Sequence, residues 1–441
     1  MKENSFYLVS LGCAKNTVDS ESMATLLAQN GYRGVDKPGQ AEVLIVNTCG
    51  FIDSARQESI EVLQDLAMHK KPGQKLIAAG CLPERSRQLM IEKIEGVDGF
   101  LGSRRWMDIL DLLGEMRAAP APRYHLPDFP TIGTDEKGIA RTALQGASAY
   151  LKIADGCRRP CAFCSIPLIK GTTVSRPMQS ILHDAETLQV AGIKEMILIA
   201  QDTTDYGYDL GMKDGLATLL ENLLPRVPEI PWVRILYAYP GYVTDHLIEV
   251  MAGSPQMLHY LDIPLQHASP SLLKSMKRPS DIDWVHQTIA KMRQAMPDLA
   301  LRSTFIVGYP GETEEDFQML LDFLQEMQFD HVGAFPFSFE PGTASEPLGD
   351  PIPEEVKQER LERLMLQQEK ISLAKNQTWI GKKMDVLIEG QGDGLSVGRT
   401  YRDAPEIDGL VLLEDDAEDG EIVPVRIDGA MTHDLTGVLE K

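Results

Sequence analysis

The sequence has no apolar run approaching the roughly 20 residues that a membrane-spanning helix requires. Its first residues, MKENSFYLVS, show neither the basic and apolar segments of a secretory signal nor the Arg-rich composition of a transit peptide. These absences argue against a membrane protein and against a secreted one. We therefore expect a cytoplasmic protein.

Basic residues are scarce relative to acidic ones. The chain of 441 residues contains 43 Lys and Arg against 65 Asp and Glu, a net charge of −22. Such a chain repels phosphate backbones unless it carries a local basic patch, so direct nucleic-acid binding is not expected. The GxxxxGK[ST] loop that cradles nucleotide phosphates is also absent. The charge favours a basic partner, although solubility alone would also account for it.

Cysteine is rare too, with six residues in the chain. Disulfides are uncommon in reducing compartments, so cysteines there more often bind metal or perform chemistry. Three of them, Cys157, Cys161 and Cys164, lie within eight residues in the stretch GCRRPCAFCSIP, and the other three are Cys13, Cys49 and Cys81. An isolated cysteine is commonly a small buried hydrophobe, but a triplet this tight predicts a bound group.

Composition divides the chain into three domains and a linker, with an α/β fold class overall. A parallel α/β domain is expected over residues 1–117, followed by a Pro-rich linker over 118–145. A second α/β domain is expected over 146–377 and a small β domain over 378–441.

The first domain contains three short apolar runs that each end in a turn with a cysteine, namely FYLVSLGC, AEVLIVNTCG and KLIAAGC. Helical patterns lie between them, which predicts a parallel sheet with crossover helices. Cys13, Cys49 and Cys81 fall just past the carboxyl ends of these strands, at the edge where open α/β sheets bind ligands. We expect the three thiols to converge there.

The second domain alternates six candidate strands, from AYLKIA to HVGAFPF, with helical stretches. Six such units predict a TIM-like, partial β/α barrel with its site at the carboxyl ends of the strands. The cysteine triplet directly follows the first strand, at the correct edge for a site.

The third domain consists of short apolar runs separated by Gly and Asp, such as KMDVLIEG and EIVPVRID. This pattern predicts a small five-stranded β-barrel. The domain carries 15 Asp and Glu against 6 Lys and Arg, a net of −9. This charge makes the domain poorly suited to bind RNA and well suited to bind a basic protein.

The triplet has the spacing C-x3-C-x2-C. Three thiolates on one loop can each hold one iron of a [4Fe–4S] cluster, and without a fourth cysteine nearby one iron stays open. A structural zinc site is the alternative, with a distant residue such as His183 as the fourth ligand. Redox-active thiols are a third interpretation.

With the aromatic Phe163 before its last cysteine, this motif resembles that of the radical S-adenosylmethionine (SAM) enzymes. The resemblance implies that the open iron on Cys157, Cys161 and Cys164 chelates the methionine part of SAM, which is then cleaved to a 5′-deoxyadenosyl radical. It also implies that Phe163 packs on the adenine, with a core aromatic as the alternative. A sheltered barrel mouth suits a species that attacks nearby C–H bonds.

The resemblance extends over nearly the whole chain. SLGCAKNTVDSE, NTCGFIDSA, YLDIPLQHASP and RSTFIVGYPGETEEDF together resemble the methylthiotransferases. This implies a second [4Fe–4S] cluster on Cys13, Cys49 and Cys81 and a TRAM-like substrate-binding domain at the carboxyl end. LGCAKN, LYAYP and KRP resemble the branch that modifies small-subunit ribosomal protein twelve, free or in the ribosomal subunit. The transfer-RNA branch usually differs at these stretches.

The resemblance also implies a division of labour between the clusters. The first would hold a sulfur that one SAM molecule methylates. A second SAM molecule, cleaved at the other cluster, would abstract hydrogen from the β-carbon of an aspartate, and the carbon radical would take the methylthio group. No side chain can deprotonate such an unactivated C–H bond, so radical chemistry is required. The sequence identifies neither the sulfur donor nor the electron donor.

Four further residues are candidate cofactor contacts. Gln201 follows the second barrel strand and would replace the Gly-Gly-Glu stretch with which many such enzymes hold the methionine amino group. Arg302 would pair with the cofactor carboxylate, or else form a structural ion pair. Gly308 and Gly311 would let the backbone approach the adenosine, or else form a tight strand–helix turn.

Two other motifs have simpler interpretations than catalysis. Thr313 with Asp316 predicts a helix capping box. His267 predicts a hydrogen-bonded structural histidine.

Two alternative functions stay open. One is methylthiolation of a transfer-RNA adenosine, against which the acidic third domain weighs. The other is a non-enzymatic zinc or iron–sulfur scaffold, which iron and sulfide analysis would distinguish.

Overall fold

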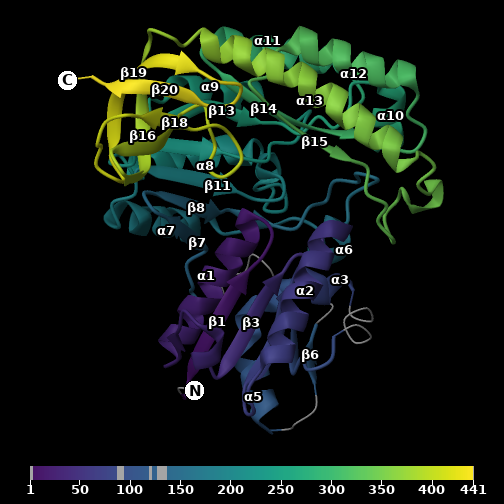
Figure 1. Ribbon diagram of the computed structural model, residues 1–441, viewed down its shortest axis with the longest axis vertical. Coiled ribbons are helices and arrows are strands. Elements are labelled where there is room, and N and C mark those ends of the chain that lie inside the picture. The colour runs from purple at the N-terminus through teal and green to yellow at the C-terminus, as the bar shows by residue number, and fades with distance from the viewer. Residues whose placement is uncertain (1–2, 87–93, 119–121, 127–136, 441) are drawn as a thin grey trace.

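The computed structural model describes residues 3–86, 94–118, 122–126 and 137–440. Two α/β domains lie one above the other, and a small β-barrel packs beside the upper one (Figure 1). The predicted architecture is confirmed in all three domains. None of the described helices is both long and apolar enough to cross a membrane.

The amino-terminal domain is built on a parallel six-stranded sheet in the order β2-β1-β3-β4-β5-β6. The strands are β1 Ser5–Ser10, β2 Arg33–Gly34, β3 Val43–Thr48, β4 Lys75–Gly80, β5 Gly99–Gly102 and β6 Arg123–His125. Helices α1 (Ala14–Gln29) and α5 (Ile109–Ala118) pack one hydrophobic core against the sheet. Helix α2 (Asp53–His69) packs a second core on the other face. The short helix α3 (Cys81–Arg85) follows β4 directly.

The central domain contains a seven-stranded sheet in the order β15-β14-β13-β12-β11-β8-β7. The strands are β7 Thr142–Gln145, β8 Ser148–Lys152, β11 Glu195–Ile199, β12 Trp232–Ile235, β13 Met257–Asp262, β14 Ala300–Val307 and β15 His331–Pro336. The six strands from β8 to β15 are parallel, as predicted, and β7 joins the edge antiparallel. Among the described residues no pairing joins β15 to β7, so the barrel is partial.

Helices cover the outer face of this curved sheet and bury one large core against it. They are α7 Met178–Val190, α8 Gly215–Leu223, α9 Asp245–Gly253, α11 Ile282–Ala295, α12 Glu314–Met327 and α13 Glu354–Gln377. Two short helices, α6 Ile166–Lys170 and α10 Pro270–Ser275, contribute no residue to that core. The capping box predicted for α12 is present, with Thr313 and Asp316 each bonding the other's backbone N–H.

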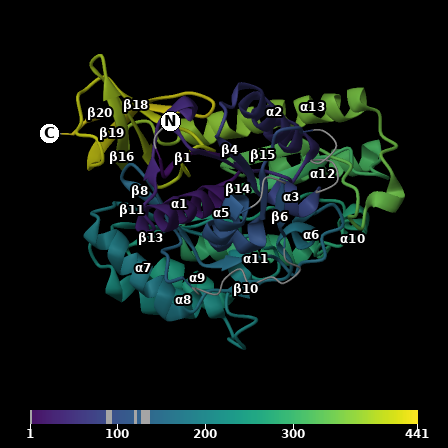
Figure 2. The same ribbon diagram turned by 90° about the horizontal axis from the view of Figure 1, so that it is seen from below.

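The segment 118–145, interpreted as a linker, contributes an edge strand to each sheet that it joins. Within its described residues, β6 pairs with β5 of the first domain and β7 pairs with β8 of the second. Helix α1 also contacts β7 and β8, so the amino-terminal domain rests against the central one (Figure 2).

The carboxyl-terminal domain is a closed barrel in the order β16-β17-β18-β20-β19. Its strands are β16 Lys383–Gly392, β17 Leu395–Thr400, β18 Val411–Leu413, β19 Ile422–Ala430 and β20 Leu435–Leu439. The five-stranded barrel is therefore confirmed. It packs against the amino ends of the central strands, where Gly420 faces Ala147 and Arg399 reaches Ser148.

Buried ion pairs hold this barrel in place. Glu195, at the start of β11, accepts from Nε of Arg234 at 2.7 Å and from Nη2 of Arg399 at 2.7 Å. All three side chains are almost completely buried. Burial alone would raise the pKa of Glu195, but the two guanidinium groups outweigh it and lower the pKa from 4.5 to about 2.

Replacement of this carboxylate is expected to destabilise the protein. Glu195→Gln leaves two buried guanidinium groups with a neutral partner, a change that costs about 3–5 kcal/mol. Urea unfolding measures the effect. The matched control is Lys194→Met, which removes only the exposed pair with Glu421 at 3.0 Å and should cost about 0–1 kcal/mol. Equal losses in the two variants would contradict the assignment.

The same group predicts a pH dependence. Because its pKa is lowered on folding, the stabilisation from Glu195 is present above about pH 4.5 and is lost as the pH falls towards 2. Thermal unfolding of wild type and Glu195→Gln between pH 7 and pH 2 tests this. The difference in stability should shrink across that window, and a constant difference would argue against it.

Candidate functional site

Three cysteines lie at the carboxyl edge of the amino-terminal sheet. Cys49 and Cys81 directly follow β3 and β4, and Cys13 follows β1 by three residues. In the sheet, β1, β3 and β4 are neighbours. Since the carboxyl ends of parallel strands share one edge, the structure brings these thiols together as the sequence predicted.

Glycines next to these cysteines allow the close approach. Gly12 and Gly80 have φ angles of +92° and +95°, which residues with a side chain rarely adopt. A Cβ atom on Gly12 would lie 3.1 Å from Sγ of Cys49. A Cβ atom on Gly80 would clash with Asn47 and Thr48. The backbone is therefore shaped to leave room around the sulfur atoms.

The three thiols differ in exposure, because Cys49 and Cys81 are buried, whereas Cys13 is exposed. Burial, with smaller contributions from Cys13 and Cys49, outweighs the opposing charge of Lys170 and raises the pKa of Cys81 to about 12. Asn16 lies beside Cys81, with Oδ1 3.6 Å from Sγ. The free thiols of Cys49 and Cys81 are thus neutral near pH 7, and metal binding would displace their protons.

The second group, Cys157, Cys161 and Cys164, lies on the loop after β9 (Ala154–Asp155). Gly156 precedes it at φ +75°, and a Cβ atom there would clash with the carbonyl oxygen of Thr172. Burial, with a smaller contribution from Cys161, raises the pKa of both Cys157 and Cys164 to about 12. This group therefore has the same character as the first.

Aromatic and basic side chains surround Cys161. The hydroxyl of Tyr239 lies 3.7 Å from its Sγ, and Nη1 of Arg278 donates to it at 3.5 Å. The guanidinium of Arg278 stacks on the Tyr239 ring at 4.3 Å, and that of Arg159 does so at 4.6 Å. The sequence alone indicated no role at Cys161 for Tyr239 or Arg278, although Tyr239 lies in LYAYP and Arg278 lies in KRP.

The two cysteine groups adjoin each other across the domain interface. Ser165, next to Cys164, donates from Oγ to the carbonyl oxygen of Phe51 at 2.9 Å. Phe51 follows Cys49 by two residues, so the two cysteine-bearing loops are in direct contact. Arg85 fixes the first loop by donating to the carbonyl oxygens of Gly50 and Phe51 at 2.8 and 2.7 Å.

A buried charge network beside these loops joins the domains. Asp19 of α1 accepts from Arg141 at 2.7 Å, from Lys152 at 2.8 Å and from Lys170 at 3.0 Å. Asp155 pairs with the same three cations. Burial would raise the pKa of Asp19, but Lys152, Lys170 and Arg141 outweigh it and lower the pKa. The network fixes α1 on the central domain.

The thiols do not form a single-ion site. In the part of the chain that the structure describes, no three Cys, His, Asp or Glu side chains converge tightly enough to hold one metal ion. His183, the fourth ligand of the zinc alternative, is exposed on α7. A tetrahedral zinc site needs every ligand within about 2.3 Å of one centre. Two separated groups of three thiols fit a polynuclear cluster better, because each thiolate then binds a different iron.

Gln201 has a free hydrogen-bonding atom, as expected of a ligand-binding residue. It follows β11, and its Oε1 atom is buried without a hydrogen-bond partner among the described residues. Its neighbour Asp202 accepts from Nε of Arg159 at 2.6 Å, two residues beyond Cys157. An unpartnered carbonyl oxygen beside the cysteine loop fits an amino group of a bound molecule.

Arg302 forms ion pairs with two aspartates. Its Nη1 donates to Asp262 at 3.1 Å and its Nε donates to Asp408 of the carboxyl-terminal domain at 3.2 Å. Asp408 also accepts from the Tyr260 hydroxyl at 2.7 Å. These contacts lie at the amino end of β14 and favour the structural ion pair that was the alternative for this residue.

The remaining candidates line the carboxyl ends of β14 and β15. Phe163 packs against the cluster that contains Tyr309 and Phe337 and stays partly exposed. Gly308 has φ +73°, and a Cβ atom there would clash with Lys357 of α13, as in a tight turn. Gly311 has open space around it.

His267 is a structural residue, as interpreted from the sequence. It is buried, with Nδ1 accepting from the backbone N–H of Ser269 at 2.9 Å and Nε2 lying 3.2 Å from Glu312.

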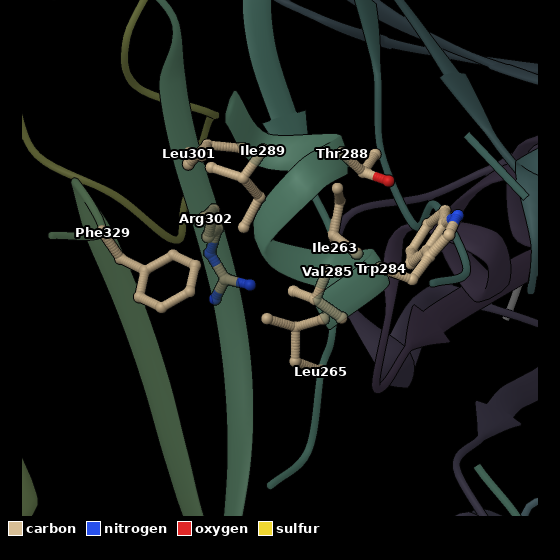
Figure 3. Close-up of a pocket in the computed structure, with 9 residues that line it drawn as sticks. All are labelled: Ile263, Leu265, Trp284, Val285, Thr288, Ile289, Leu301, Arg302 and Phe329. Atoms are coloured by element: carbon tan, nitrogen blue, oxygen red, sulfur yellow. The ribbon is translucent and has the colours of Figure 1, made fainter. Parts of the chain in front are cut away.

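A small pocket between α11 and the strands β13 and β14 is not part of this site. Figure 3 shows its lining, which comprises Ile263, Leu265, Trp284, Val285, Thr288, Ile289, Leu301, Arg302 and Phe329. Most of these side chains belong to the outer hydrophobic core. The pocket is a packing gap rather than a ligand site.

Three family models match the chain. Residues 5–102 match the Uncharacterized protein family UPF0004, residues 151–324 match the Radical SAM superfamily, and residues 380–439 match the TRAM domain. The three matches coincide with the three folded domains.

Curated relatives match over nearly the full length. The chain is 46% identical to the ribosomal protein uS12 methylthiotransferase RimO of Roseiflexus sp. (strain RS-1), over 98% of this chain and 96% of the relative. It is 47% identical to the protein of that name from Chloroflexus aurantiacus, over 98% and 99%. The Synechocystis protein of that name is 44% identical over 97% and 96%.

Solved structures share the fold. The radical SAM methyltransferase TsrM of Kitasatospora setae, with cobalamin and a [4Fe–4S] cluster bound, superposes with a TM-score of 0.59 at 12% identity, covering 90% of this chain and 77% of that one. At this identity the likeness concerns the fold alone.

The burial of the thiols predicts the order in which they react. In metal-free protein at pH 7.5, Cys13 should be alkylated by iodoacetamide well before Cys81, Cys157 and Cys164, because the last three are held as neutral thiols. Timed alkylation followed by peptide mass spectrometry measures this, and alkylation in urea serves as the control that makes all six equal. Uniform rates in the folded protein would refute the assigned burial.

Proposed function

The chain belongs to the ribosomal protein uS12 methylthiotransferase (RimO) family of radical SAM enzymes, and we propose that it adds a methylthio group to the β-carbon of an aspartate in uS12. The observation that carries the proposal is the pair of three-cysteine groups on loops in direct contact across one domain interface. A sulfur source and a radical source must both reach one carbon atom, and adjoining loops provide for that.

We propose that Cys13, Cys49 and Cys81 hold one [4Fe–4S] cluster, and that the triplet on the second loop, Cys157, Cys161 and Cys164, holds another. When bound, the cluster on the second loop supplies the electron that cleaves SAM to a 5′-deoxyadenosyl radical. The burial of Cys157, only 8% exposed, supports the proposal for the second loop, because a buried site keeps water from a reactive species.

The residues around Cys161 would tune that site. An N–H donated by Arg278 to the sulfur stabilises the thiolate, and hydrogen bonds to sulfur are a main control of cluster potential. Tyr239 stacks with both arginines and holds the guanidinium groups in place.

For SAM itself we propose three sets of contacts. Gln201 would accept from the methionine amino group through its unpartnered Oε1. Phe163 would pack on the adenine, and Gly308 and Gly311 would lie near the adenosine. Arg302 was a candidate for the carboxylate, and its two aspartate partners instead favour a role in docking the carboxyl-terminal domain.

The substrate is supported by the charge of the carboxyl-terminal domain. Two of its six basic residues, Arg399 and Arg402, are buried at the interface with the central domain. Two acidic residues of the domain, Asp403 and Asp408, are buried there as well, so the rest of the domain keeps the net charge of −9 that follows from 15 Asp and Glu against 6 Lys and Arg. Such a surface attracts a basic ribosomal protein and repels RNA, which disfavours a transfer-RNA substrate. A ribosomal substrate also supports the cytoplasmic location.

Separate cysteine variants should divide the reaction into its two halves. A variant with Cys13, Cys49 and Cys81 changed to Ala should keep about half of the iron and still form 5′-deoxyadenosine, but leave uS12 unmodified. A variant with Cys157, Cys161 and Cys164 changed to Ala should form no 5′-deoxyadenosine. Iron analysis, chromatography and intact-protein mass spectrometry measure these outcomes.

Wild-type enzyme with uS12, SAM and reductant is the positive control, and transfer RNA is the alternative substrate. Zinc without iron or sulfide in anaerobically purified protein would rule out the enzyme. Modified transfer RNA with unmodified uS12 would instead establish the alternative substrate.

A further inference from the structure

Lys15 is a buried cation that the proposed chemistry leaves without a role. It lies in the first turn of α1 and is only 9% exposed. Its Nζ atom lies 3.1 Å from the centre of the Tyr237 ring. Asp19, one turn further along α1, already pairs with Arg141 and two lysines. Among the described residues, no carboxylate lies within ion-pair distance of Lys15.

Tyr237 places this ammonium at the mouth of the central sheet. It follows β12 and has an unusual positive φ of +65°. Its carbonyl oxygen accepts from the backbone N–H of Thr203, two residues beyond Gln201, at 3.1 Å. Two residues further along the chain, Tyr239 reaches Cys161. Strained backbone of this kind is concentrated at functional sites.

Along the chain, Lys15 lies next to residues of the amino-terminal cysteine group. Cys13 precedes it by two residues and caps α1. Asn16, the next residue, lies beside Cys81 and donates to the carbonyl oxygens of Leu11 and Thr48 at 2.9 and 3.0 Å. Lys15 therefore connects the surroundings of the two cysteine groups, because its neighbour Asn16 lies beside Cys81 and its ammonium contacts Tyr237, two residues from the tyrosine that reaches Cys161.

The electrostatics of this position call for an anion. A nearly buried ammonium whose only close partner in the described part of the chain is an aromatic face has given up hydration without gaining a counter-charge. The amino terminus of the 16-residue helix α1 adds a partial positive charge at the same place. A carboxylate brought into the space between the loops would neutralise both.

We propose that Lys15 determines specificity by binding the carboxylate of the target aspartate. This inference rests on the proposed function, because it takes the substrate to be an aspartate side chain presented between the two clusters. The carboxylate is one bond from the β-carbon, so an ion pair with Lys15 would hold that carbon between the radical source and the sulfur. It would also select aspartate over the isosteric asparagine.

A double-mutant cycle tests the ion pair directly. The enzymes are reconstituted wild type, Lys15→Met, which keeps the length and apolar stem of the side chain, and Lys15→Arg, which keeps the charge. The ligands are uS12 and uS12 with its modified aspartate changed to asparagine. Wild type and Lys15→Arg should bind the aspartate form at least about tenfold more tightly, whereas Lys15→Met should bind both forms equally. Fluorescence anisotropy of labelled uS12 measures the six affinities.

The matched control is Lys194→Met, which removes one lysine at the amino end of β11, away from the cysteines, and should keep the wild-type preference for aspartate. Iron content identifies any variant that has lost its fold. A Lys15→Met enzyme that still prefers aspartate as strongly as wild type would overturn the role of Lys15. Failure of wild type to modify uS12 would overturn the proposed function as well, so the two failures are distinguishable.

Discussion

The structure depends on one buried carboxylate, that of Asp19, which joins two domains through three cations of the central domain. Without Asp19, the buried cations Arg141, Lys152 and Lys170 would share the single carboxylate of Asp155, and an uncompensated buried charge costs several kcal/mol. The relative position of the two cysteine groups therefore follows from charge pairing rather than from a flexible hinge. Lys170 also lies near Cys81, so the same network reaches the amino-terminal cysteine group.

Burial raises the pKa of both kinds of group at this interface, with different outcomes. The buried Cys81 thiol stays protonated, whereas close cations overcome the same burial and keep Asp19 ionised. The network is thus charged without any ligand, with three cations on two carboxylates. The buried thiols of Cys49, Cys81, Cys157 and Cys164 would instead lose their protons only on binding a metal.

Much of this arrangement could be predicted from the sequence. The strands preceding Cys13, Cys49 and Cys81 had clear apolar runs, and parallel strands must end at a common edge, so the convergence of these thiols followed. The five-stranded carboxyl-terminal barrel and the capping box of α12 were predicted from equally local patterns.

What could not be predicted depends on contacts between distant residues. Arg302 meets Asp408, 106 residues away, and nothing in the strand around it indicates that partner. The pairing of Tyr239 with Arg278 at Cys161 and the contact of Lys15 with Tyr237 have the same origin. The edge strands β6 and β7 lie in a stretch whose prolines are typical of a linker.

The carboxyl-terminal barrel packs at the amino ends of the central strands, whereas the cysteine loops lie at their carboxyl ends. A strand of five residues such as β11 separates the two ends by about 17 Å. A substrate held by the acidic barrel must therefore reach along the length of the central domain to present its aspartate. Selection of the modified residue would then depend on its distance from the docking surface as much as on the sequence around it.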